Sequence, residues 1–271
     1  MHIIFVCIEF EFYLQRALEG DKMKNIKAEL CIETYEAAKE AERLGFDSIE
    51  INSALVIGGL TPSYGLVKNI SENISIEKIC MVRNRPSGFN YTDHEFQAML
   101  CELDILLQEK IDGISFGFLT EDFQVDKNKT KIFADRIKNA GKIAVFHRAF
   151  DNTCDPYRAV EDLIDLNIDR ILTSGQCESA FDGRLLIKDL VDKYSNKIEF
   201  IVGSGVNENN VRALLDETCA EYVHSSCKML YNDITTNNKI SYSIFEGKSN
   251  SYIGLDSKIA ERFIDEIKKY N

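Results

Sequence analysis

Residues that could do chemistry stand where short apolar runs of this sequence end. The run IAVF leads into His147 and Arg148, and Asp151 follows three residues after the arginine. An imidazole exchanges protons near neutral pH, and a guanidinium holds anions. Comparable endings occur at Glu29 and Cys31, at Glu50, at Arg83 and Arg85, and at Ser174. The repetition predicts one site, built where several strands end together.

Two later apolar runs end in small and hydroxyl residues. EFIV is followed by Gly203, Ser204 and Gly205, and YVH is followed by Ser225 and Ser226. Backbone N–H groups of such loops bind phosphate in many barrels, although Gly-Ser-Gly can also be a plain tight turn. The nearby arginines favour a bound anion. The predicted anion-binding residues are Arg83, Arg85, Arg148, Ser174, Gly203, Ser204, Gly205, Ser225 and Ser226.

Three carboxylates and one histidine are the candidate acid–base groups: Glu29, Glu50, Asp151 and His147. Burial raises the pKa of a carboxyl group unless an arginine keeps it ionised. The alternative is therefore a closed Glu–Arg network that only braces the fold. The sequence has no nucleophile elbow, HExxH or Walker motif that would identify a reaction.

Apolar runs alternate with amphipathic patterns along the chain. Strands are predicted near residues 26–32, 48–51, 78–83, 113–117, 143–147, 170–172, 199–202 and 222–224. Helices are predicted at residues 34–44, 62–69, 93–108, 129–139, 156–166, 180–194, 208–215 and 256–269. Strands that are apolar on both faces and separated by helices form parallel sheets. Eight such units predict a single-domain (β/α)8 TIM barrel, and the alternative is an open doubly wound sheet.

The barrel is expected to occupy residues 26–271. Thr61 and Asp155, each before a proline, predict helix N-caps, and Gly45 predicts a left-handed C-cap. Residues 1–25 are expected to lie outside the fold, with Met23 as an alternative start, or else to dock as an arm. Residues 231–254, rich in Asn, Ser, Thr and Tyr, predict a long loop between strand 8 and helix 8. Such a loop is either a lid or a disordered insertion.

Composition excludes several classes of partner. The formal net charge of −12 argues against nucleic acid and against an anionic membrane surface. No run approaches the roughly 20 apolar residues of a membrane span. The eight cysteines include no CxxC pair, so they indicate a reduced, cytoplasmic protein rather than a disulfide framework. Cys31, His147, His224 and Cys227 could meet at one rim, and a thiolate suits Cu(I). By spacing alone, a metal ranks below an anion.

Several segments together resemble the CutC family of copper-homeostasis proteins. They are ELCIETYEAAKEAERLGFDSIEINS, GGLTPSYGL, VRNRPSGFNYTDHEF, FHRAFD, LTSG and VGSGV with VHSSCK, in that order over roughly residues 26–228. The resemblance implies a TIM barrel in the cytosol with a role in copper handling, through Cu(I) binding. The family's motif residues map onto Glu29, Cys31, Glu50, Arg83, Arg85, His147, Arg148 and Asp151.

Two positions depart from the family pattern. Many relatives have Leu-Cys after the glutamate, where this chain has Ile51 and Asn52, so one candidate thiolate is missing. The family's Arg-Pro-Arg reads Arg83-Asn84-Arg85.

Two functions follow from these observations. The resemblance implies a copper(I) protein with Cys31 and His147 as metal ligands. The residues themselves favour a TIM-barrel enzyme that acts on a small phosphorylated or carboxylated metabolite. The expected partner is accordingly a copper ion or a small anionic ligand, and homo-oligomerisation is left open.

Overall fold

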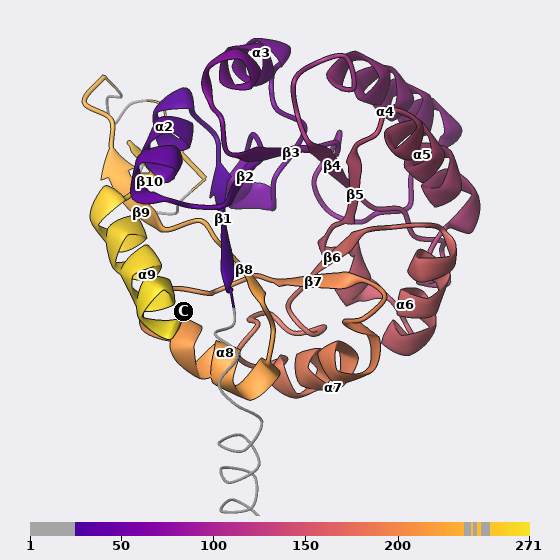
Figure 1. Cartoon of the computed structure of the whole chain (residues 1–271). Helices are drawn as coiled ribbons and strands as arrows, with labels where there is room; N and C mark the ends of the chain where they lie inside the picture. The colour runs from indigo at the N-terminus through magenta and orange to yellow at the C-terminus, as the bar shows by residue number, and fades with distance from the viewer. Residues whose placement is uncertain (1–24, 236–239, 241–242, 245–249) are drawn as a thin grey trace, which may run out of the picture.

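The computed structural model describes residues 25–235, 240, 243–244 and 250–271. Within them, parallel strands close into a barrel in the order β1 to β8 (Figure 1). The strands are β1 Lys27–Ile32, β2 Ser48–Ile51, β3 Glu77–Met81, β4 Gly113–Phe116, β5 Ile143–Phe146, β6 Arg170–Thr173, β7 Glu199–Val202 and β8 Tyr222–Ser225. The predicted TIM barrel is confirmed, and the open sheet is excluded because β1 pairs with β8.

A ring of helices surrounds the barrel, as Figure 1 shows. They are α2 Tyr35–Leu44, α3 Tyr64–Asn73, α4 Asp93–Leu106, α5 Lys127–Asn139, α6 Pro156–Asp165, α7 Arg184–Tyr194, α8 Val211–Thr218 and α9 Ser257–Tyr270. Two short 3-10 helices, η1 Leu55–Ile57 and η2 Arg148–Asn152, follow β2 and β5. No helix in the described part of the chain has the length and apolar character that crossing a bilayer requires.

Most predicted boundaries are close to the observed ones. Asp155 caps α6 with Pro156 in its first turn, and Gly45 ends α2 with φ 87°. The predicted cap at Thr61 is wrong, because Ser63 caps α3 and the Thr61 hydroxyl donates to Glu102 instead. Helices α7 and α8 begin several residues later than predicted, since turns precede them.

The barrel interior is layered because alternate side chains of each strand point inward. Its middle is an apolar layer of Ile79, Val145, Leu172 and Ile201. At the N-terminal end, Arg170 lies 2.5 Å from carboxylates of both Glu77 and Glu199. This ionic layer closes the barrel at the end away from the C-terminal rim.

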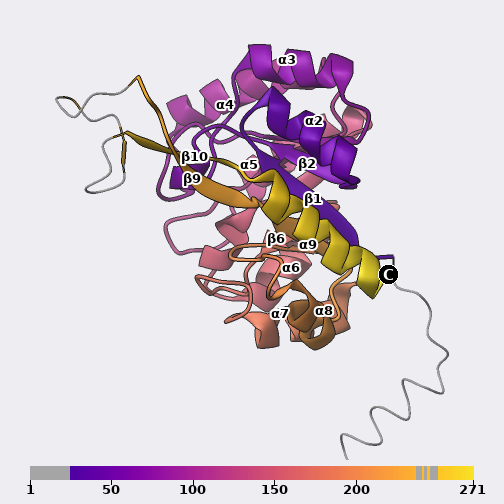
Figure 2. The same ribbon diagram turned by 90° about the vertical axis from the view of Figure 1, so that its left-hand side faces the viewer.

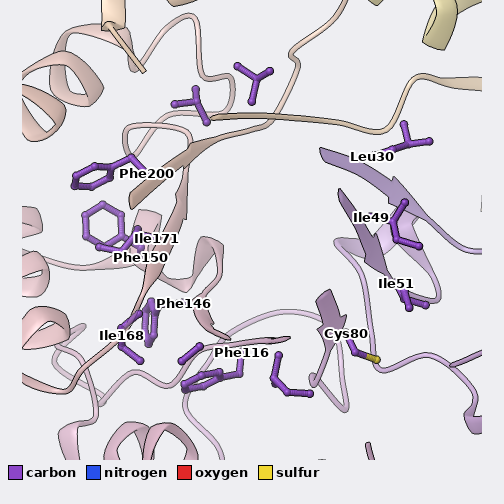
Figure 3. Packing of buried hydrophobic residues seen from close by; sticks show 14 of the residues in the cluster. Leu30, Ile49, Ile51, Cys80, Phe116, Phe146, Phe150, Ile168, Ile171 and Phe200 are labelled. Carbon is purple, nitrogen blue, oxygen red and sulfur yellow. The ribbon is translucent and has the colours of Figure 1, made fainter. Parts of the chain in front are cut away.

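The larger core lies between the strands and the helices. It contains apolar residues from all eight barrel strands and from the inner faces of the helices. Figure 3 shows Leu30, Ile49 and Ile51 of β1 and β2 grouped at one part of it, and Phe116, Phe146 and Phe150 at another. This core fixes each strand against its helix and thereby fixes the strand ends that carry the site.

The segment predicted as a long loop begins and ends in strands. β9 Lys228–Asn232 pairs antiparallel with β10 Ser251–Leu255. Figure 2 shows this hairpin extending from one end of the barrel. The remainder of the predicted loop, and the predicted N-terminal extension with its alternative start at Met23, lie largely or wholly outside the described residues.

Candidate functional site

A cavity of about 530 Å³ lies at the C-terminal rim of the barrel. Eleven of the candidate residues named from the sequence line it: Cys31, Glu50, Arg83, His147, Arg148, Ser204, Gly205, His224, Ser225, Ser226 and Cys227. Met81, Leu172 and Val206 add apolar surface to the wall. The closure of the barrel thus brings most of the predicted polar groups to one place.

Cys31, Glu50 and His224 form a compact group in this cavity. One potential ligand atom from each lies within 4.8 Å of the others. The group follows from strand register, since Cys31 of β1 pairs with Glu50 of β2, while β8 lies on the other side of β1. Cys31 and Glu50 are 7% and 3% exposed, and the His224 side chain is 11% exposed. A thiol, a carboxylate and an imidazole so arranged could hold one metal ion.

Asn52 lies against this group. Its Nδ2 donates to Cys31 Sγ at 3.3 Å and to Glu50 Oε2 at 2.9 Å. The Cys31 thiol in turn donates to Glu50 Oε2 at 3.5 Å. A Cβ added at Gly59, where φ is 81°, would lie 2.5 Å from Asn52 Oδ1. The absence of a side chain at Gly59 therefore leaves room for the Asn52 amide.

We call Cys31, Glu50 and His224 the metal-capable group. Glu29 lies behind this group rather than in the cavity wall. Its Oε1 is 2.8 Å from His224 Nδ1, and its Oε2 accepts from Ser48 Oγ at 3.0 Å. Ser48 Oγ is also 2.6 Å from the Tyr222 hydroxyl. A carboxylate bonded to one nitrogen of an imidazole orients the ring and leaves the other nitrogen for a ligand. Glu29 is thus a positioning residue for His224.

The thiol and the imidazole of this group have shifted pKa values. Burial, followed by the charges of Glu50 and Glu29, raises the pKa of Cys31 well above its ordinary 9.0. Burial opposes protonation of His224, but the hydrogen bond to Glu29 and the charges of Glu50 and Glu29 outweigh it. The pKa of His224 is therefore raised above 6.5. The charges of Glu50 and Glu29 contribute to both shifts, so the group attracts positive charge.

His147 lies elsewhere in the cavity wall, apart from the metal-capable group. Its Nδ1 accepts the Ala149 N–H at 3.1 Å, and its Nε2 is buried without a partner among the described residues. Burial, and then the charge of Arg83, lower the pKa of His147 to about 3. The ring is therefore neutral. The pairing of His147 with Cys31 as metal ligands stays a prediction, and the group that lies around Cys31 contains Glu50 and His224 instead.

Arg83 is held by main-chain carbonyl groups and contributes one charged part of the wall. Its Nη1 donates to Gly59 O at 2.8 Å and its Nη2 donates to Ser87 O at 2.9 Å. The guanidinium lies 5.2 Å from the ring centroid of Phe89, and the His147 ring lies 5.0 Å from the same centroid. Arg83 and His147 therefore flank one aromatic side chain.

Asp151 and Ser174 support Arg148 and do not line the cavity. Asp151 Oδ2 accepts from Arg148 Nε at 2.8 Å, and Ser174 Oγ accepts from Arg148 Nη2 at 2.8 Å. Asp151 also accepts the Ser174 N–H at 3.0 Å. These bonds fix η2 against the end of β6 and hold the Arg148 side chain in place. Arg148 itself lines the cavity.

Arg85 is directed to another partner. Its Nε lies 2.5 Å from Glu95 Oε1, and its Nη2 donates to Asn90 O at 2.6 Å. Glu95 also completes the capping box of α4 with Thr92. Arg85 is absent from the cavity wall. Arg85 stabilises the β3–α4 loop instead. Its spacing of two residues from Arg83 predicts that both side chains face the same site, but spacing does not show which partner each one meets.

The β7–α8 loop forms the opposite wall. Ser204, Gly205 and Val206 line the cavity, and their backbone N–H groups donate to no acceptor within the described residues. Gly203 packs closely against Leu172 and His224, where a Cβ would lie 2.9 Å and 3.2 Å from their side chains. The Ser225 hydroxyl donates to Val206 O at 2.7 Å and holds the two loops together. Glu208 also lines the wall, and its carboxylate lies 2.8 Å from Arg262.

His224 is the member of the group around Cys31 that the sequence predicts least directly. It was one of four rim residues compatible with a metal, and strand order supplies the missing signal. In a closed barrel, strands 1 and 8 are neighbours, and the observed register places His224 opposite Glu29. Cys227 lines the cavity but lies outside the metal-capable group, and burial raises its pKa to about 11.

The fold and this rim define a (β/α)8 barrel with a polar cavity at the C-terminal ends of its strands. The profile of the CutC family matches residues 26–229, so the chain belongs to the CutC family. It is 36% identical to a protein named family protein CutC from Treponema denticola, over 83% of this chain and 90% of that protein. It is 35% identical to the human copper homeostasis protein cutC homolog, over 74% of this chain and 72% of that protein.

Solved structures agree with this assignment. The putative copper homeostasis protein CutC of Streptococcus agalactiae superposes with a TM-score of 0.70 at 28% identity, covering 74% of this chain and 98% of that one. Phosphoribosylanthranilate isomerase of Thermotoga maritima superposes with a TM-score of 0.51 at 14% identity, covering 90% and 98%. The second likeness is one of fold alone.

Proposed function

We propose that the chain handles copper by binding one Cu(I) ion at Cys31 and His224, with Glu50 beside them. The observation that carries this proposal is the clustering of the three side chains within 4.8 Å. Thiolate and imidazole are ligands suited to Cu(I). Because Glu29 occupies His224 Nδ1, Nε2 is the nitrogen left for the ion. The names of the human and mouse relatives carry the same association.

The negative charge of the buried carboxylates favours a cation at this group. Cys31 and Glu50 are buried, and Glu29 behind them is 2% exposed. No lysine or arginine forms an ion pair with Glu29 or Glu50 among the described residues. A bound cation would neutralise this negative charge and replace the proton of the Cys31 thiol. We therefore expect copper affinity to rise with pH.

An anaerobic Cu(I) titration against a competing chelator tests the proposal. Cys31→Ser and His224→Gln should each weaken binding by at least about tenfold, since each removes a ligand. Cys227→Ser is the matched control, because Cys227 lines the same cavity outside the group. Equal affinity in all four proteins would refute a copper site here.

A second candidate is favoured by the β7–α8 loop. We infer that the amides of Ser204, Gly205 and Val206 bind a small oxyanion, such as a phosphoryl group, and that the barrel acts on an anionic metabolite. Three unpaired N–H groups in a cavity wall are the donors that an oxyanion requires. Arg148 adds positive charge to the same cavity. The buried, unpartnered Nε2 of His147 is an independent sign of a missing ligand.

Inorganic phosphate is the probe for this anion site. Amide chemical shifts of Ser204, Gly205 and Val206 should move on titration, and Ser226→Asp should abolish the change by charge repulsion. Ser195→Asp, at an exposed position after helix α7 that does not line the cavity, is the control. No shift at any phosphate concentration up to tens of millimolar would reject the anion site.

We also propose a reducing, cytoplasmic location. The seven described cysteines are all free thiols, and Cys101 and Cys154 are exposed. Exposed thiols persist where glutathione and thioredoxin keep them reduced. Labelling of these two cysteines by a thiol reagent immediately after cell lysis is the direct measurement.

A further inference from the structure

His147 is a buried histidine with one nitrogen that nothing in the described protein satisfies. The residue is 3% exposed and lines the rim cavity. Its Nδ1 accepts a hydrogen bond from the Ala149 backbone N–H, so the proton must be on Nε2. Nε2 is thus a hydrogen-bond donor, buried without an acceptor. Unpaired buried donors are costly, so they mark a missing partner.

The ring is held firmly in this orientation. A Cβ added at Gly117 would lie 2.6 Å from the His147 ring, so the strand passes very close on that side. Phe89 packs at 5.0 Å between centroids. The Ala149 bond belongs to the first turn of η2 and fixes Nδ1. A ring fixed in this way cannot turn to exchange its two nitrogens.

We propose that His147 Nε2–H donates to a carbonyl or carboxylate oxygen of the ligand whose phosphoryl group binds the amides of Ser204, Gly205 and Val206. The inference rests on the proposed anion site and specifies the class of its ligand: a small phosphorylated carbonyl or carboxyl compound. The ligand would lie across the cavity, from the β7–α8 loop to the end of β5. The positive charge of Arg83, beside the same Phe89 ring, favours an electron-rich oxygen at that end.

Matched phosphate esters test this inference by calorimetry. Dihydroxyacetone phosphate and 3-hydroxypropyl phosphate differ at one carbon, a carbonyl in the first and a methylene, which cannot accept a hydrogen bond, in the second. The wild-type protein should prefer the first by about tenfold, the worth of one such hydrogen bond. 2-Phosphoglycolate carries a carboxylate in place of the carbonyl. Whichever of 2-phosphoglycolate and dihydroxyacetone phosphate binds with the higher affinity identifies the preferred oxygen.

His147→Phe removes the donor and keeps an aromatic ring against Phe89. It should abolish the preference between the esters and leave inorganic phosphate binding unchanged, which also reports that the variant folds. His147→Gln, which restores an N–H donor, should recover part of the preference. Nitrogen NMR of wild-type His147 should show a neutral ring protonated on Nε2 from pH 5 to 8.

The outcomes separate the two proposals. The role of His147 alone would be overturned by either of two results. In the first, the protein binds phosphate but does not discriminate between the two esters; in the second, the discrimination survives in His147→Phe. Absence of phosphate binding would reject the anion site and this inference with it. Ester discrimination lost in His147→Phe, with phosphate binding retained, supports both.

Discussion

His224 Nδ1 lies 2.8 Å from Glu29 Oε1, across the seam where β8 meets β1. The pair exists only because the barrel closes, since the two residues are far apart in the sequence. It couples the protonation of an imidazole in the cavity to a carboxylate inside the barrel. Ser48 and Tyr222 extend the same hydrogen-bonded chain toward the ionic layer of Arg170.

Glu29→Gln should lower the pKa of His224, because the variant replaces a charged hydrogen-bond acceptor by a neutral one and removes one of the two charges that raise this pKa. Chemical shifts of the His224 ring, followed from pH 4 to 9, measure the change. Ser48→Ala leaves the carboxylate in place and should have a smaller effect. An unchanged His224 pKa in Glu29→Gln would contradict the coupling.

The raised pKa of His224 also predicts a pH dependence of stability. A group that is more basic in the folded state stabilises the protein fully below its unfolded pKa of about 6.5. That contribution disappears as pH rises through the higher folded pKa. Urea unfolding of wild type and His224→Gln at pH 5.5 and pH 9 should therefore show a larger difference at the lower pH.

Gly59→Ala should destabilise the protein by about 1–3 kcal/mol, through a positive φ and a collision with the Asn52 amide. It should also weaken Cu(I) binding, because Asn52 contacts both Cys31 and Glu50. Gly65→Ala, where an added Cβ meets nothing within 4 Å, is the matched control. That control should be neutral or stabilising by up to about 1 kcal/mol, since Gly65 lies in helix α3.

Asn52→Cys should raise Cu(I) affinity by at least about tenfold, because a second thiolate would lie beside Cys31. The present Asn52 Nδ2 is 3.3 Å from Cys31 Sγ, so the new sulfur would enter the same group. Asn52→Ser controls for loss of the amide. Competition with a chelator under anaerobic conditions gives the three affinities, and equal values would argue against Cys31 as a ligand.

Arg170→Ala should destabilise the protein by about 3–5 kcal/mol, because it leaves the Glu77 and Glu199 carboxylates without their shared partner inside the barrel. Arg136→Ala removes an exposed pair with Asp104 and should cost at most about 1 kcal/mol. Denaturant unfolding of both variants compares the two losses. Similar values would mean that the ionic layer contributes no more than a surface pair.

Strand and helix order could be predicted because apolar runs and amphipathic segments alternate regularly along the chain. The rim site could be located because polar residues recur at strand ends. The pairing of those residues could not be predicted, since it depends on register and loop geometry. Arg83 and Arg85 are both arginines and stand two positions apart. Arg85 nevertheless bonds Glu95 of a capping box, while Arg83 lines the cavity.

Asp151 illustrates the same limit. Its spacing from His147 suggested acid–base chemistry, while its oxygens are bonded by Arg148, Thr173 and Ser174. The closeness of η2 to the end of β6, which brings Thr173 and Ser174 to Asp151, cannot be read from the spacing in the sequence.

Neighbouring residues at the end of β8 serve different parts of the cavity. His224 belongs to the metal-capable group with Cys31 and Glu50, while Ser225 ties the strand to the β7–α8 loop. The remaining members of the two groups come from separate stretches of the gene. During evolution, substitutions in one of these groups could therefore accumulate while the other group stayed intact. Relatives within one family could in this way share a barrel and differ in what they bind.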